Sequence, residues 1–166
     1  MISLVESLRY RCLRYIRQPL RHFHVLVGPN ASGKTTFLDA IGFLGQLVSE
    51  GLDAALDSRT RNFQDLLWAH HGTDFEIAVE AKIPDDKREL LAVKKYDTVR
   101  YEVSIGREVT GEVVINAERG WLRLSNGEQT QSRIQFPDPE PPPTHIVTQK
   151  KGKEQSRSLF SKTPGG

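Results

Sequence analysis

The chain has 166 residues, of which 37% are hydrophobic and 27% are charged, and its formal net charge is +2. These values are ordinary for a globular domain and exclude a collagen-like, coiled-coil or wholly disordered chain. The single cysteine, Cys12, excludes an internal disulfide framework and favours a reducing compartment. No apolar run approaches the roughly 20 residues of a membrane-spanning helix, and arginines interrupt the apolar stretches near the N-terminus. We therefore expect a cytoplasmic protein that makes no membrane contact.

The small net charge hides a segregation along the chain. Residues 1–24 carry five Arg against one Glu, residues 25–143 carry 13 basic against 19 acidic side chains, and residues 144–166 carry five basic against one acidic. A basic end can bind a phosphate polymer, and it can equally be a solvated strand face or a disordered tail. Neither end has the interleaved aromatic residues of a single-strand nucleic-acid binder, which favours the solvated alternative.

The first 48 residues predict a strand, a second strand, a loop and a helix. Residues 3–16 alternate in pieces with the period of a half-exposed strand, and Pro19 ends that segment. Residues 23–27, FHVLV, form a short apolar run that stops at Gly28 and predicts a buried strand. From Lys34 to about Val48, apolar residues recur at helical spacing.

The next 76 residues predict short helical pieces followed by a sheet. Residues 51–68 have the apolar spacing of short helices, and residues 83–97 form a charged connection with room for one helical turn. Residues 75–81 and 98–105 alternate strictly between polar and apolar, and residues 112–118 and 121–124 do so less cleanly. We expect an antiparallel sheet with one face in water. Residues 137–143, PDPEPPP, predict an extended linker, and the polar residues after it predict a mobile tail.

A motif with chemical meaning lies between the second predicted strand and the helix. Residues 28–36, GPNASGKTT, satisfy the phosphate-loop pattern G-x-x-x-x-G-K-[ST]. A loop of this kind leaves a buried strand and opens a helix, so that backbone N–H groups and the positive helix end converge on an anion. A lysine in the first helical turn opposes the helix dipole, so a purely structural glycine turn would rarely carry Lys34.

The chemistry of phosphate binding assigns a role to each residue of the loop. Gly33 lets the backbone approach the phosphates, and Lys34 reaches the β- and γ-phosphates as the catalytic charge. The Thr35 hydroxyl is the expected Mg²⁺ ligand, and Thr36 donates to the α-phosphate. The predicted nucleotide-binding loop comprises Gly28, Pro29, Asn30, Ala31, Ser32, Gly33, Lys34, Thr35 and Thr36.

The segment GPNASGKTTFLDAI resembles the Walker A region of ABC-type ATPase heads, particularly the OLD-like, RecF-like and SMC-like AAA family ATPases. Such heads carry an aromatic-Arg-small triplet in their first strand, which Tyr10, Arg11 and Cys12 match. The resemblance implies an α/β P-loop NTPase fold, with an ABC-ATPase-like N-terminal lobe over residues 1–136. That lobe would have a mixed sheet and an antiparallel β-subdomain over about residues 74–130, and residues 137–166 would be a Pro-rich linker and flexible basic tail.

The same resemblance implies ATP and Mg²⁺ as cofactors, and it implies that Arg11 approaches the phosphates. An exposed strand arginine is the alternative role for Arg11. ABC-type heads hydrolyse ATP only when a second lobe supplies a Walker B strand, four apolar residues followed by Asp-Glu, and a signature loop. The sequence contains no such Walker B strand. LSNGEQ, residues 124–129, resembles a signature loop, but Asn126 and Gly127 favour a hairpin turn because the proline run that follows cannot be helical.

We therefore expect an ATP-binding lobe that stops before the second lobe and hydrolyses ATP slowly or not at all by itself. The resemblance implies completion by a second ATPase lobe and a head-to-head homodimer. Family members act in DNA repair or phage defence, so DNA and a nuclease are expected partners. A small P-loop phosphotransferase and a non-catalytic interaction module are the alternatives.

Other polar residues have two interpretations each. Gln64 and Gln135 are candidates for the glutamine that senses Mg²⁺, although Gln64 also suits the exposed face of a short helix. His70 and His71 are adjacent and would face apart, which favours loop histidines over a metal pair.

Aromatic residues and the cysteine near the N-terminus are also open to more than one interpretation. Tyr10 or Tyr15 could stack on adenine, as aromatic residues of the first strand do in ABC-type heads, or pack in the core. Cys12 is expected to be a small buried hydrophobic residue.

Overall fold

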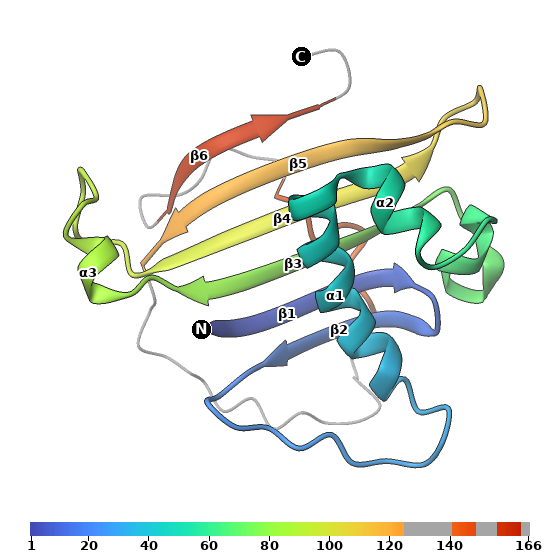
Figure 1. Ribbon diagram of the computed structural model, residues 1–166, viewed down its shortest axis with the longest axis horizontal. Helices are drawn as coiled ribbons and strands as arrows, with labels where there is room; N and C mark the ends of the chain where they lie inside the picture. The colour runs from blue at the N-terminus through green and yellow to red at the C-terminus, as the bar shows by residue number, and fades with distance from the viewer. Residues whose placement is uncertain (125–140, 149–155, 164–166) are drawn as a thin grey trace.

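The computed structural model describes residues 1–124, 141–148 and 156–163. Its strands are β1 (Ile2–Tyr10), β2 (Leu13–Pro19), β3 (Asp74–Lys82), β4 (Thr98–Arg107), β5 (Val113–Arg123) and β6 (Ser156–Lys162). Its helices are α1 (Lys34–Glu50), α2 (Leu52–Asp57) and α3 (Asp85–Arg88), with 3-10 turns η1 (Phe63–Leu66) and η2 (Trp68–His70). The described strands form one sheet in the order β2-β1-β3-β4-β5-β6, and every neighbouring pair is antiparallel (Figure 1).

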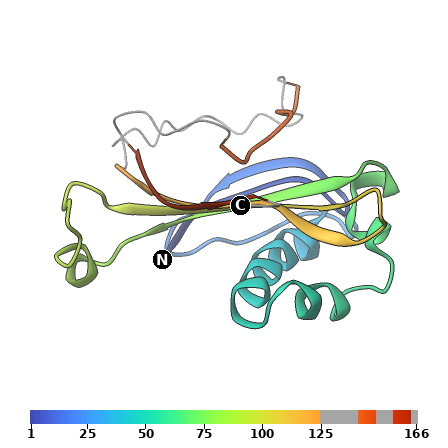
Figure 2. The same cartoon turned by 90° about the horizontal axis from the view of Figure 1, so that it is seen from above.

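Helices α1 and α2 cover one face of this sheet (Figure 2). The period of 3.6 residues gives α1 a single apolar stripe, which is buried against the inward side chains of the strands. The Phe43 ring of α1 meets the Phe75 ring of β3 edge to face, with centroids 5.5 Å apart. The buried residues of α1 are Phe37, Ala40, Phe43, Leu44 and Leu47, and the strands contribute Tyr10, Phe75, Ile77, Val103 and Ile105.

Residues 144–148 cover the opposite face of the sheet (Figure 2). The Glu76 carboxylate of β3 accepts hydrogen bonds from the backbone N–H groups of Ile146 at 2.6 Å and Val147 at 2.9 Å. The Glu102 carboxylate of β4 accepts one from the Thr148 N–H at 2.8 Å. Both glutamates are buried. The prediction that this face lies in water is therefore wrong where residues 144–148 cover it.

A buried arginine, Arg100, pairs with Glu102 and with Glu6 of β1. Arg100 donates through Nε to Glu102 Oε1 at 2.6 Å and through Nη2 to Glu6 Oε2 at 2.9 Å. Burial lowers the pKa of Arg100, but the neighbouring Glu6 and Glu102 carboxylates raise it, and the net shift is upward. The buried charges of Arg100, Glu6 and Glu102 thus compensate one another, as burial requires.

The N-terminal half of the sheet differs from the prediction in its connections. Residues 3–16 do not form one strand, because the chain turns at Arg11 and Cys12 between β1 and β2. Arg9 and Arg11 adopt positive φ angles of 60° and 51°, so this turn lacks the glycine that usually announces one. The mixed sheet is likewise not found, since the described strands are antiparallel throughout.

The C-terminal half contains more strand than predicted. Residues 112–118 and 121–124 merge into the continuous strand β5. Part of the predicted flexible tail forms β6, which pairs with β5 through Arg157 opposite Leu122 and Phe160 opposite Gly120. Backbone hydrogen bonds hold an edge strand in place, so it needs no apolar face. The polar sequence of β6 therefore lacked the alternation that would predict a strand. The predicted turn at Asn126 and Gly127, and residues 137–140 of the linker, lie outside the described residues.

Candidate functional site

The phosphate loop ends at the open N-terminus of α1. Gly33 has φ 89° and ψ 4°, a left-handed conformation that favours glycine, and the helix begins at Lys34. No described side chain caps the first turn, and no acidic residue lies in it. A helix N-terminus without a cap presents free N–H groups and the positive end of the dipole. The local geometry therefore fits a phosphate group.

The Lys34 ammonium group makes hydrogen bonds within its own loop. Its Nζ donates to the carbonyl oxygens of Gly28 at 2.7 Å and Pro29 at 2.6 Å, and lies 3.2 Å from Ser32 Oγ. These three oxygens are the kind of acceptor that a nucleotide phosphate can replace. The Thr35 side chain, the predicted Mg²⁺ ligand, is exposed at the same helix start.

The predicted buried strand before the loop is wrong. Residues 23–27 pair with no strand in the described part of the chain, and Phe23 and Val27 are 80% and 88% exposed. A strand becomes buried only when its backbone groups find partners. The six described strands pair among themselves and none pairs with this segment, which leaves an apolar run in solvent.

The turn between β1 and β2 lies against the start of α1. Cys12 Sγ is 3.1 Å from Thr36 Oγ1, and the Arg11 backbone N–H donates to Leu66 O at 2.8 Å. The structure therefore places Arg11, which was predicted to approach the phosphates, near the phosphate loop. Cys12 is exposed, which overturns its predicted burial, because the turn carries it to the surface.

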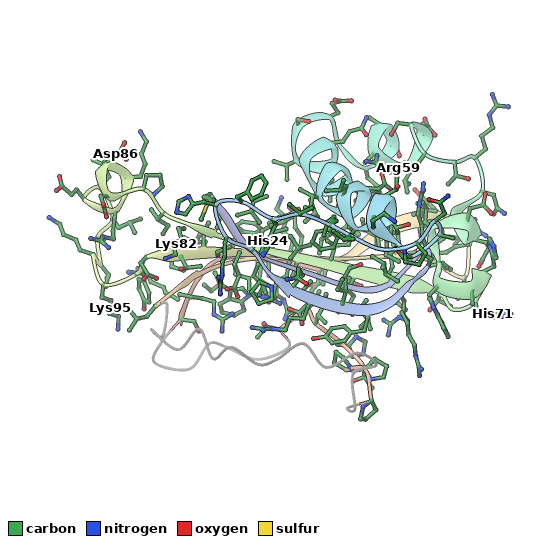
Figure 3. The ribbon with its side chains drawn as sticks, turned by 90° about the horizontal axis from the view of Figure 1, so that it is seen from below. His24, Arg59, His71, Lys82, Asp86 and Lys95 are labelled. Atoms are coloured by element: carbon green, nitrogen blue, oxygen red, sulfur yellow. The ribbon has the colours of Figure 1, made fainter. Side chains whose placement is uncertain are left out.

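Asp39 connects three elements of the site and was missed by sequence reasoning. Its Oδ2 accepts a hydrogen bond from the Tyr10 hydroxyl at 2.6 Å, and its Oδ1 accepts one from Arg59 Nε at 2.8 Å. The Arg11 Nε lies 3.3 Å from Oδ2. Figure 3 labels Arg59 on the helix side of the molecule. No local pattern links residues so far apart in the chain, so a single sequence could not reveal this cluster.

The two tyrosines take structural places. Tyr10 is fully buried in the core beneath α1, and burial, followed by the bond to Asp39, raises its pKa well above the ordinary value. Tyr15 packs on the opposite face and donates to Glu6 Oε1 at 2.8 Å. The core alternative is thus confirmed for Tyr10.

The remaining polar candidates lie apart from the loop contacts described above. Gln64 is half-buried in η1, and Gln135 lies outside the described residues. His70 is 3.7 Å from Asp65, and among the described residues no cluster of three or more metal-ligating side chains occurs. No helix in the described ranges is both long and apolar enough to cross a membrane.

Comparison with known proteins identifies relatives of this chain. A family model described as "AAA domain, putative AbiEii toxin, Type IV TA system" matches residues 23–157, which include the phosphate loop, α1 and strands β3, β4 and β5. The chain is also 31% identical over 84 residues to "Structural maintenance of chromosomes protein 1B" from Homo sapiens. That match covers 49% of this chain and 6% of the human protein.

Proposed function

The chain belongs to this family of AAA domains, a P-loop ATPase class related to SMC and ABC-type proteins. From that membership we propose that it binds Mg·ATP as one lobe of an ABC-type ATPase. The observation that carries the proposal is the glycine-bounded loop at the uncapped N-terminus of a 17-residue helix, with Lys34 reaching across it. This geometry supports phosphate binding through main-chain N–H groups.

Three loop residues and Arg11 have assigned roles in the proposed site. Lys34 would exchange the Gly28 and Pro29 carbonyl oxygens for phosphate oxygens when nucleotide binds. Gly33 lets the loop pack closely against the start of β2, since a Cβ there would lie 3.1 Å from Leu13 Cδ2 and its φ is positive. The Thr35 hydroxyl would hold the Mg²⁺, which supplies charge neutralisation for the transferred phosphoryl group. Arg11 would contact the phosphates from the β1–β2 turn.

Exposed apolar surface supports the need for a second lobe. Residues 23–27 leave Phe23 and Val27 in solvent, and the outer side of α1 exposes Leu38 at 57% and Val48 at 70%. Val25, Leu26 and Val27 are adjacent and exposed, and contiguous apolar side chains in water usually mark an interface. The sequence also lacks a Walker B strand, so the groups that polarise an attacking water would come from elsewhere.

The wider role remains part of the proposal. We infer that a longer parent chain or another polypeptide supplies the second lobe, that two heads then meet around ATP, and that the assembly serves DNA repair or phage defence. DNA and a nuclease would be partners of that assembly. The resemblance to SMC-like heads supports this assignment.

Phosphate release from Mg·ATP tests the proposal. We expect slow or no release by the chain alone and clear stimulation by the second lobe. Val27→Asp should reduce the stimulation without changing the melting temperature, because the Val27 side chain is exposed. Val109→Asp, which alters an exposed valine in the turn between β4 and β5, is the matched control.

Two other outcomes would replace the proposal. Transfer of phosphate to a small-molecule acceptor by the isolated chain would identify a phosphotransferase. A complete lack of nucleotide binding would leave an interaction module.

A further inference from the structure

Asp39 lies one helical turn beyond the phosphate loop, on the same side of α1 as Thr36. Cys12 contacts Thr36 at 3.1 Å, and Arg11 pairs with Asp39 at 3.3 Å. Two successive residues of the β1–β2 turn therefore contact two successive turns of the helix. This double contact fixes the turn beside the helix start at which phosphate is proposed to bind.

The pairing of Arg11 with Asp39 leaves the arginine able to bind an anion. Asp39 Oδ2 is already engaged by the Tyr10 hydroxyl at 2.6 Å, and Arg11 Nε at 3.3 Å makes no hydrogen bond of its own. Within the described residues, no hydrogen bond from the Arg11 guanidinium is found, and a third of the side chain is exposed. The attraction is thus electrostatic, and the outer N–H groups of the guanidinium stay available for a phosphate oxygen.

The carboxylate itself is held firmly in place. Arg59 binds Asp39 Oδ1 at 2.8 Å and also donates through Nη1 to Gln46 Oε1 at 2.7 Å and to Ala55 O at 2.9 Å. Its side chain is 11% exposed, so water competes little with these bonds. With one oxygen on Arg59 and the other on Tyr10, the carboxylate cannot rotate away from Arg11.

We propose that Asp39 is a positioning residue, which holds the Arg11 guanidinium beside the phosphate loop while leaving its outer N–H groups free for nucleotide phosphate. This inference rests on the proposed nucleotide-binding function. A fixed arginine loses less side-chain entropy when phosphate binds than one that must be ordered from solvent. Asp39 thereby acts on the nucleotide through Arg11 and touches no phosphate itself.

A double-mutant cycle tests the inference by calorimetric titration of Mg·ATP into the full chain. The four proteins are the wild type, Asp39→Asn, Arg11→Gln and the double variant. Asp39→Asn retains the shape and one acceptor oxygen, for either Tyr10 or Arg59, but removes the charge that attracts Arg11. We expect it to weaken Mg·ATP binding about three- to tenfold in the wild type, from the cost of ordering one side chain. In the Arg11→Gln background we expect no further loss.

Asp74→Asn is the matched control. Asp74 pairs with Arg9 at 2.6 Å and is as exposed as Asp39, but it belongs to β3 and its pair with Arg9 is separate from the α1 contacts. Its affinity for Mg·ATP should equal that of the wild type. If Asp39→Asn does not fold, Asp39→Glu in both backgrounds asks the same question, because the longer side chain displaces the carboxylate from Arg11.

Three results would overturn the inference in distinguishable ways. Equal losses in both backgrounds would make Asp39 structural, and tighter binding by Asp39→Asn would mean that Asp39 withholds Arg11 from phosphate. A wild type that binds no Mg·ATP would overturn the proposed function and this inference with it.

Discussion

The Lys34 ammonium donates to the Gly28 carbonyl oxygen at 2.7 Å, so the positive charge of the phosphate loop is held by the loop's own backbone. Lys34→Ala should therefore leave the melting temperature of the nucleotide-free chain within about two degrees, because a surface loop contact contributes little to stability. It should abolish the protection that Mg·ATP gives against thermal unfolding. Thermal melts with and without Mg·ATP measure both effects. Lys94→Ala removes an exposed lysine far along the chain and should keep the protection, whereas a collapse of nucleotide-free stability in Lys34→Ala would make the lysine structural.

Gly33 occupies a left-handed conformation that a side chain would strain. Gly33→Ala should destabilise the chain by about 1–2 kcal/mol and weaken nucleotide binding, because the loop must shift from Leu13. Gly45→Ala is the control: its Cβ would meet nothing within 4 Å in mid-helix, so it should stabilise by about 0.5–1 kcal/mol. Urea unfolding gives both values. Equal stability of the two variants would mean that the loop is not strained at Gly33.

Glu76 holds residues 144–148 on the sheet. Glu76→Gln should lower the free energy of unfolding by about 1–3 kcal/mol, since a buried carboxylate that accepts two backbone N–H bonds becomes an amide. Glu112→Gln, at an exposed position, should change it by less than about 0.5 kcal/mol. Chemical denaturation compares them. An unchanged stability of Glu76→Gln would show that residues 144–148 do not depend on this contact.

Tyr10 should make stability fall at high pH. Its folded-state pKa lies above the ordinary 10.0, through burial and then the bond to Asp39, so the folded chain keeps a proton that the unfolded chain loses. The stabilisation is complete below about pH 10 and declines above it, by up to about 1.4 kcal/mol per pH unit for this group. Denaturation of the wild type and Tyr10→Phe at pH 8 to 11 measures the difference between them. That difference should shrink as pH rises above 10, and a constant difference would contradict the assigned shift.

Local periodicity predicted the parts of the fold in which neighbours along the chain determine the structure. The spacing from Lys34 to Val48 gave α1, and strict alternation gave β3 and β4. Pairing partners are a property of the whole chain, which is why the strand predicted at 23–27 is unpaired and the polar β6 was taken for a tail. Glu76 and Glu102 stand at polar positions of the alternating strands β3 and β4, which predicts exposure to water. The sequence could not show that residues 144–148 bury them.

The candidate site likewise has one part that the local sequence predicts and one part that it does not. Consecutive glycine, lysine and threonine residues specify the phosphate loop because its chemistry depends on local backbone geometry. The cluster of Tyr10, Arg11 and Arg59 around Asp39 depends on the packing of a turn, a helix and a loop, which residue spacing along the chain does not specify.

The central claim is that the loop at the start of α1 binds a nucleotide triphosphate. Isothermal titration of ATP with excess Mg²⁺ into the purified chain measures this directly. We predict saturable heat at one site per chain that is lost in Lys34→Ala. A flat titration of the folded wild-type chain, or the same heat from Lys34→Ala, would contradict the account.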